Sequence, residues 1–221
     1  MRRLNWAALI GTILAALSLN SSPSRPPLDS TPAPEITWTA IFGKAPPPAS
    51  RPPGGSRGND EQVYAIAPGQ IGRAEVWHDQ PLFVWQGSIR QIELVTATGT
   101  VWSQAVTATT HSIAYPGPTL QPGRTYEWII YNLTKVPIAR VAFRIMAAPE
   151  REQIAADLAE LTAQFTAQFS DATPEQIALQ RANYFADRQL WADVLQEAFA
   201  VTEPSSELVR IQNEITARVA A

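Results

Sequence analysis

The sequence contains no cysteine and only two histidines among its 221 residues. Without cysteine, disulfide bonds, thiol catalysis, iron–sulfur clusters and cysteine-ligated zinc are all excluded. Charged residues make up only 17% of the chain, against about 25% in ordinary globular proteins. With so few ligating side chains, we expect neither a metal site nor a cofactor.

Neither sign of charge is in large excess. The chain has 17 basic and 20 acidic side chains, which give a formal net charge of -3. Nucleic-acid binding requires Lys and Arg clustered on one face, because they must displace counterions from the phosphates. We therefore expect no nucleic-acid partner.

The N-terminal residues follow the pattern of a secretory signal. Arg2 and Arg3 precede an apolar run over 4–19, and small polar residues follow at 20–22. This order predicts a signal peptide over 1–22 and a periplasmic or secreted protein. Because the apolar run is shorter than the roughly 20 residues that cross a bilayer, cleavage is the favoured outcome. The alternative is an uncleaved anchor in the inner membrane, and we expect no other membrane contact.

Proline is concentrated in the next stretch, where ten of the 19 prolines lie between Pro23 and Pro53. Such a composition buries too little apolar surface to offset the entropy of ordering, so we predict a disordered linker over 23–58. A β-branched and aromatic piece at 35–42 favours a strand that docks on the edge of the next domain. The glycine-rich piece at 54–58 lacks the ending of a phosphate loop and is interpreted as a joint.

Residues 59–148 consist of short β-type runs separated by turn residues. Apolar and polar side chains alternate within several of these runs, as strands with one buried face require. Seven runs predict an antiparallel β-sandwich with Trp85, Trp102 and Trp128 in its core. The expected strands cover 63–67, 81–85, 90–96, 101–107, 112–115, 126–132 and 138–146.

Residues 149–221 change to a helical period and to an acidic composition. Thr173 and Gln176 form the pattern of a capping box, which predicts a helix start. This region holds 12 acidic and 5 basic side chains, whereas residues 59–148 hold six of each. We therefore predict an α-helical hairpin module of three or four helices and an α+β fold with segregated strands and helices. The first apolar stripe comprises Ile154, Leu158, Leu161, Phe165 and Phe169.

Candidate catalytic groups are present but lack a catalytic context. His78 precedes Asp79 and His111 precedes Ser112, so a Ser, His and carboxylate set exists in the chain. A triad also needs a nucleophile on a strained turn and oxyanion donors, and the sequence has no G-x-S-x-G elbow. We therefore assign no catalytic residue and expect a protein that is not an enzyme.

The tryptophans and phenylalanines support two binding hypotheses. Trp191 and Phe199 in the helical module are candidate anchors for a protein partner, since interfaces favour such residues. Trp38, Trp77 and Trp102 are candidates for stacking on sugar rings of a cell-wall polysaccharide. For all five residues the alternative is packing in the core, which is the more frequent place for aromatic side chains of strands and helices.

Two parts of the chain, and the order of its parts, resemble known families. The corner over 120–128, after the aromatic strand 80–85, resembles the fibronectin-III pattern. This resemblance implies that the sandwich is immunoglobulin- or fibronectin-III-like and that Tyr126 bonds its hydroxyl back onto the preceding turn. The helices around Tyr184–Asp187 and Leu190–Leu195 are similar to one tetratricopeptide hairpin. After a signal peptide and a Pro/Gly/Arg-rich stretch, this order resembles the exported cyanobacterial domain of unknown function 928 family over roughly residues 50–200. The resemblance implies no catalytic residue and no known ligand.

Together these patterns predict an exported, non-catalytic envelope protein. We expect it to act as a protein-interaction or structural adaptor whose partner is an unknown envelope protein. The alternative is a module that binds a cell-wall polysaccharide through aromatic side chains of the sandwich.

Overall fold

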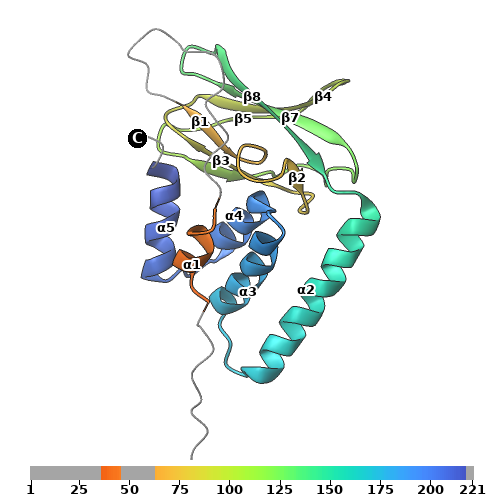
Figure 1. Cartoon of the computed structure of the whole chain (residues 1–221). Coiled ribbons are helices and arrows are strands. Elements are labelled where there is room, and N and C mark those ends of the chain that lie inside the picture. Colours follow the sequence, from red (N-terminus) through yellow and green to blue (C-terminus); the bar gives the residue numbers. More distant parts are fainter. Residues whose placement is uncertain (1–35, 46–62, 218–221) are drawn as a thin grey trace, which may run out of the picture. The chain divides into compact units, whose positions relative to one another are not determined.

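The computed structural model describes residues 36–45 and 63–217, and these described residues belong to one compact unit (Figure 1). The predicted signal peptide and most of the predicted linker lie outside the described residues. Within the described part, no helix is both long enough and apolar enough to cross a membrane.

Eight described strands form two sheets. The first sheet has the order β1-β3-β6 and the second has the order β2-β8-β7-β4-β5. All pairings are antiparallel except that of β2 with β8. The seven predicted strands are present with small shifts of their ends, and β2 was missed because two residues cannot show alternation. The strands are β1 (Tyr64–Ala67), β2 (Glu75–Val76), β3 (Leu82–Gln86), β4 (Gln91–Thr96), β5 (Gly99–Ala105), β6 (Ser112–Ala114), β7 (Thr125–Tyr131) and β8 (Pro137–Ile145).

Aromatic rings fill the space between the two sheets. Phe83 of β3 lies with its ring centroid 5.1 Å from that of Trp128 on β7 and 6.2 Å from that of Phe143 on β8. Trp85 and Trp128 are completely buried, and Trp102 stacks on Phe83 at the partly buried margin of the core. The predicted α+β fold with an immunoglobulin- or fibronectin-III-like sandwich is confirmed.

The turn before β7 is fixed by a hydrogen bond that the sequence predicts. The backbone N–H of Gln121 donates to the hydroxyl oxygen of Tyr126 over 2.9 Å. Tyr126 itself is buried. The expected bond from the tyrosine back onto its own turn is therefore confirmed, and it holds the loop before β7 against the end of the sandwich.

Four helices follow the sandwich, and α4 and α5 pack on it. The capping box at Thr173 is confirmed, because the Thr173 hydroxyl accepts from the Gln176 backbone N–H and the Gln176 side chain accepts from the Thr173 N–H. Ala192 and Leu195 belong to the sandwich core as well as to a helix. The helices are α2 (Ala148–Gln168), α3 (Pro174–Asp187), α4 (Trp191–Ala200) and α5 (Ser206–Ala217).

Strand β3 is buried on both of its faces, because sheet and helices cover it from opposite sides. Phe83 points to the facing sheet, so its neighbours Leu82 and Val84 occupy the other face of the strand. Helices α4 and α5 pack against β3. An uninterrupted apolar run from Leu82 to Trp85 is what a strand in that position needs.

The strand predicted over 35–42 is wrong, because Trp38–Phe42 forms the short helix α1. Thr37 caps it by accepting a hydrogen bond from the Ala40 backbone N–H at 3.1 Å. Trp38 and Ile41 lie three positions apart and therefore share one face of the helix, and both are buried among the helices. The Trp38 indole N–H donates to Glu175 of α3 at 2.9 Å, so α1 docks on the helical module and not on a sheet edge.

We expect Trp38→Ala to lower the free energy of unfolding by about 3 kcal/mol, because the substitution leaves a large cavity. Urea denaturation followed by circular dichroism measures this change. Lys44→Ala, at an exposed position in the same segment, serves as the control and should change stability by less than about 0.5 kcal/mol. Equal stability of the two variants would contradict the docking of α1.

Candidate functional site

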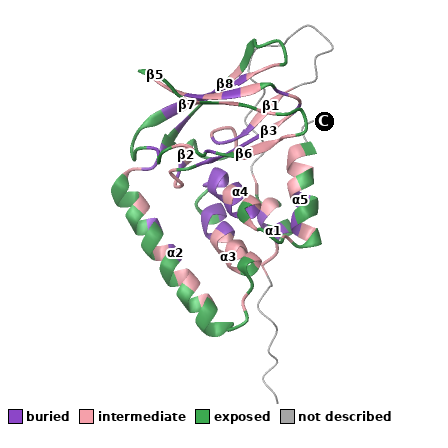
Figure 2. Ribbon diagram, turned by 180° about the vertical axis from the view of Figure 1, so that it is seen from behind, coloured by how far each residue is buried: buried purple, intermediate pink, exposed green. Residues whose placement is uncertain are grey.

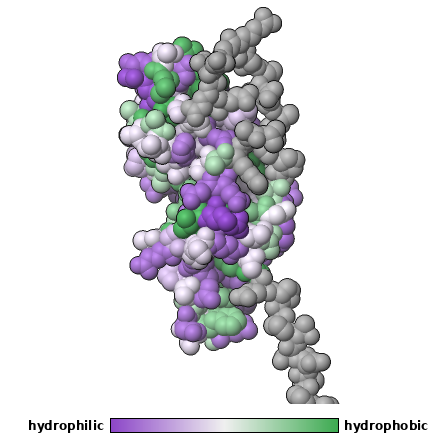
Figure 3. Space-filling model, turned by 90° about the vertical axis from the view of Figure 1, so that its left-hand side faces the viewer, coloured by the Kyte–Doolittle hydropathy of each residue, from purple (hydrophilic) through white to green (hydrophobic). Residues whose placement is uncertain are grey.

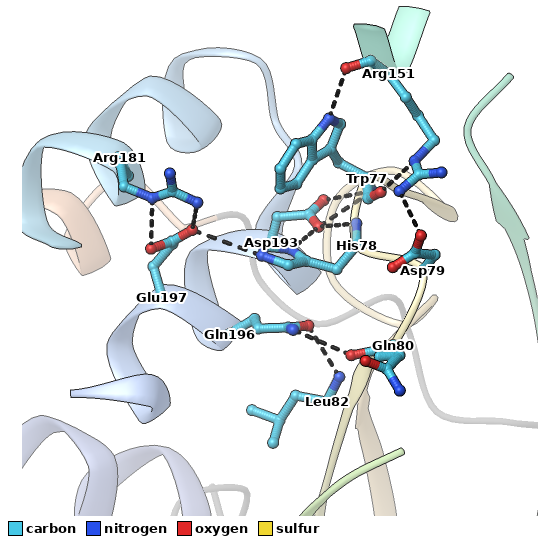
Figure 4. A network of polar contacts seen from close by, with 10 residues as sticks. All are labelled: Trp77, His78, Asp79, Gln80, Leu82, Arg151, Arg181, Asp193, Gln196 and Glu197. Carbon is cyan, nitrogen blue, oxygen red and sulfur yellow. Dashed lines mark hydrogen bonds and ion pairs between the residues drawn. The ribbon is translucent and has the colours of Figure 1, made fainter. Parts of the chain in front are cut away.

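The described ionisable side chains are most densely connected where α4 meets residues 77–80, which link β2 to β3 (Figure 4). We call this region the seam. Its backbone and side-chain contacts join α4 to the sandwich and reach α2 and α3. The seam comprises Trp77, His78, Asp79, Gln80, Leu82, Arg151, Arg181, Asp193, Gln196 and Glu197.

Asp193 is the most deeply buried polar group of the seam, with none of its side chain exposed. Its carboxylate accepts hydrogen bonds from the backbone N–H of Trp77 at 3.1 Å and of His78 at 3.0 Å. The His78 Nδ1 atom lies 2.7 Å from Asp193 Oδ1. Three donors therefore surround this carboxylate, which is what burial of an acidic group requires.

Glu197 lies one helical turn after Asp193 and is 7% exposed. Arg181 of α3 binds it through two nitrogens, with Nε and Nη2 at 2.9 and 2.6 Å from the carboxylate oxygens. The His78 Nε2 atom lies 3.6 Å from Glu197 Oε1. The imidazole is thus held between two carboxylates of a single helix, and Arg181 compensates the charge of the second one.

Hydrogen bonds of Arg151 and Gln196 hold the two ends of the seam. Arg151, near the start of α2, donates to the Trp77 carbonyl at 2.8 Å and to Asp79 at 2.9 Å, while the Trp77 indole N–H donates back to the Arg151 carbonyl at 3.0 Å. Gln196 of α4 accepts from the Leu82 N–H and donates to the Gln80 carbonyl, each at 3.1 Å. The side chain of Gln196 thereby pairs with backbone groups at the start of β3.

This geometry does not match that of a catalytic triad. The Nε2 atom of His78, which would face a hydroxyl nucleophile, faces Glu197 instead, and the seam contains no serine or threonine. Asp79, the neighbour in sequence, binds Arg151 and not the imidazole. The other histidine, His111, lies beside the three-stranded sheet, where its backbone carbonyl accepts a hydrogen bond from the Trp85 N–H. Among the described residues, no cluster of three or more His, Asp or Glu side chains is arranged to hold a metal ion.

The candidate binding residues are buried or partly buried. Trp191 is 2% exposed and Phe199 is partly buried, so the alternative of core packing describes both. Trp38 is buried as well. Trp77 and Trp102 are partly buried, and Trp77 lies edge-on to His78. For Trp191 and Trp38 the favoured alternative of core packing therefore holds, because both side chains fill the helical core.

The residues that carry the seam were not predicted from the sequence. Asp193 and Glu197 sit on α4, whose other positions are mostly apolar and buried (Figure 2). A helix that is apolar nearly all round is a buried helix, so acidic residues within it must find internal partners. That signal was available in the sequence, but the identity of the partners was not.

A second polar contact joins α2 to α3 away from the seam. The Tyr184 hydroxyl donates to Asp157 at 2.6 Å, and the Arg188 guanidinium lies 3.5 Å from the centre of the Tyr184 ring. Burial, reinforced by this hydrogen bond, raises the pKa of Tyr184 from 10.0 to about 12. The same hydrogen bond, together with one from Gln153, lowers the pKa of Asp157.

Comparison with known proteins finds no protein-family model and no curated protein that matches the sequence. Among solved structures, the chain is similar to the fibronectin(III)-like modules of CbhA from Clostridium thermocellum. The identity is 10% and the TM-score is 0.28, and the match covers 39% of this chain and 95% of that one. The resemblance to the domain of unknown function 928 family stays a prediction.

Replacing the buried carboxylate tests whether the seam stabilises the fold. We expect Asp193→Asn to lower the free energy of unfolding by about 3 kcal/mol, because the amide keeps the shape but cannot accept from all three donors. Urea denaturation measures the change. Asp187→Asn is the matched control, since Asp187 is exposed and its ion pair with Lys44 spans 3.6 Å. The control should lower the free energy of unfolding by less than about 1 kcal/mol. A similar decrease in both variants would contradict the prediction.

The raised pKa of Tyr184 predicts a specific pH dependence. The neutral phenol is favoured in the folded state, so its contribution to stability is complete below pH 10 and is lost as the pH rises toward about 12. We therefore expect the stability difference between wild type and Tyr184→Phe to shrink between these pH values. Denaturation at pH 9, 10, 11 and 12 measures it. A difference that stays constant would contradict the assigned cause.

Proposed function

We propose that this chain is an exported, non-catalytic adaptor whose helical module binds an envelope protein. The observation that carries the proposal is an uncovered aromatic pair at the far end of α2. The rings of Phe165 and Phe169 lie 4.9 Å apart, and Phe169 is 45% exposed. Phe165 is partly buried, yet neither side chain belongs to the cores of the described structure.

Helix α2 is suited to present such a surface. Its N-terminal half is held in place, because Ile154 and Leu158 are buried and Arg151 is bonded to the seam. The remainder is mostly exposed (Figure 2). The apolar stripe that begins at Ile154 therefore continues past its intramolecular contacts. Exposed aromatic side chains on a fixed helix are typical of anchors in protein interfaces.

The charge of the helical region favours a basic partner. Residues 149–221 hold 12 acidic and 5 basic side chains, and Glu160 and Asp171 lie close in sequence to the aromatic pair. Complementary charge increases the rate of encounter and helps to exclude wrong partners. The chemistry that fits is thus an apolar surface bordered by Lys or Arg.

The side of the molecule that carries α5 is a weaker candidate. A shallow depression there includes Val209, which is 40% exposed, beside Arg210 and Glu214. Where the described atoms are visible, Figure 3 shows hydrophilic and hydrophobic side chains interspersed on this side. Arg210 and Glu214 already pair with each other over 2.7 Å, so this depression offers little unpaired charge.

A double substitution in the full chain tests the proposal. We expect Phe165→Ser with Phe169→Ser to reduce capture of a cross-linked envelope partner at least about tenfold, because anchor residues carry most of the binding energy. Stability should change little, since neither ring contributes to a core. Quantitative pull-down from the envelope fraction, followed by a Kd measurement with the captured protein, gives the readout.

The matched control removes two exposed apolar side chains elsewhere. Leu133 and Val136 lie in the turn between β7 and β8 and are 59% and 51% exposed. Leu133→Ser with Val136→Ser should leave capture unchanged. Equal capture by wild type and by the α2 variant would contradict the proposal, and so would a loss confined to the control.

A further inference from the structure

A cavity of about 270 Å³ lies at the end of the sandwich that holds the Tyr126 turn. Its wall is formed by the turn between β4 and β5, by residues that follow β6, and by the loop before β7. This volume is just below the range of about 300 to 1,000 Å³ that is usual for drug-sized ligands. The cavity therefore has the size for a small ligand, about one sugar ring.

The polar lining of the cavity combines one cation with hydroxyl groups that can donate hydrogen bonds. Arg124 supplies the one formal charge among the lining residues, which include no carboxylate. Within the described part of the chain, its guanidinium makes no hydrogen bond or ion pair. The Thr119 hydroxyl is likewise without a described partner. Tyr126 accepts from Gln121 through its hydroxyl oxygen, which leaves the hydroxyl proton free to donate.

Tyr115 supplies a buried hydroxyl that the fold itself does not use. The residue is 2% exposed, and its hydroxyl has no hydrogen-bond partner in the described structure. Such orphaned groups are rare and call for an explanation. Burial, and then the neighbouring Tyr126, raise the pKa of Tyr115. The hydroxyl itself has no exposed surface, so Tyr115 contributes to the cavity wall through its ring.

Gly117 allows the Tyr115 ring to occupy this position. A side-chain carbon at residue 117 would lie 2.3 Å from the Tyr115 hydroxyl oxygen. Glycine is the residue that avoids this overlap. On its other side the ring meets Trp102 edge-on, with centroids 5.6 Å apart. Tyr115 is consequently fixed in the wall of the cavity.

We propose that this cavity binds a carboxylated sugar unit, with Arg124 paired to the carboxylate and the Tyr126 and Thr119 hydroxyls bonded to oxygen atoms of the sugar. A positive charge beside several donors selects a ligand that offers acceptor oxygens and negative charge. Val101, Pro118 and Leu120 form an apolar wall suited to the C–H face of the ring. A simple carboxylate would leave that wall and the hydroxyls unused. The inference is independent of the adaptor function proposed above.

Titration of the full chain with sodium glucuronate, followed by two-dimensional NMR, tests the proposal. We expect saturable shifts of the Trp102 indole and of residues 115–126. Arg124→Gln should weaken binding at least about tenfold, because it removes a charge-assisted bond. Thr119→Val should weaken binding by roughly threefold to tenfold without altering the fold, because it removes a single neutral hydrogen bond at an exposed position.

Arg90→Gln is the matched control for charge. Arg90 is also exposed, makes no side-chain bond within the described structure, and precedes the opposite end of β4 from Thr96. It should bind glucuronate as wild type does. Glucose and acetate serve as the two partial ligands, and each should bind at least about tenfold more weakly than glucuronate. Equal binding of acetate, equal losses for Arg124→Gln and Arg90→Gln, or no saturable shift would each overturn the proposal.

Discussion

The buried carboxylate of Asp193 is the constraint on which the arrangement of sandwich and helices depends. An unpaired acidic group in the interior costs several kcal/mol, so the fold must bring donors to it. The donors are backbone N–H groups of the segment between β2 and β3, together with His78. Since backbone groups cannot move independently of their strands, α4 has one position against the sandwich that satisfies the carboxylate. Burial of apolar surface alone, being non-directional, would not select that position.

Once α4 is fixed on the sandwich, contacts with it and with its neighbours position the other helices. Its packing covers the outer face of β3, which accounts for a strand that is apolar at four consecutive positions. The bidentate bond from Arg181 to Glu197 places α3 beside α4, and Arg151 joins the start of α2 to the same segment. Helix α1 then adds Trp38 to the core of the helical module. Polar contacts thus set the positions of the helices relative to the sandwich, and apolar burial supplies most of the stabilisation.

Features with a local cause could be predicted from the sequence. Alternation located the strands, Thr173 and Gln176 marked a helix start, and the corner before β7 indicated the Tyr126 bond. Helix α1 could not be predicted, because its β-branched and aromatic residues favour a strand when considered in isolation. The helix is stabilised by its packing on α3 and α5, which the local sequence does not show. The seam could not be predicted for a related reason. Asp193 binds partners more than a hundred positions away, and no local sequence pattern indicates that contact. For the same reason, the aromatic residues chosen as exposed anchors were in part core residues.

The two proposed surfaces lie at opposite ends of one helix. Arg124 is paired through its backbone carbonyl with the Ile145 N–H at the end of β8, immediately before α2 begins, whereas Phe169 follows the last residue of α2. A helix of 21 residues is about 30 Å long. A sugar unit at the sandwich end would therefore not obstruct a protein bound at the far end. Because the seam holds the start of α2 against the sandwich, the distance between the two sites is fixed by the helix. An adaptor that joins a polymer to a protein needs such a spacing, and the buried Asp193 helps to maintain it.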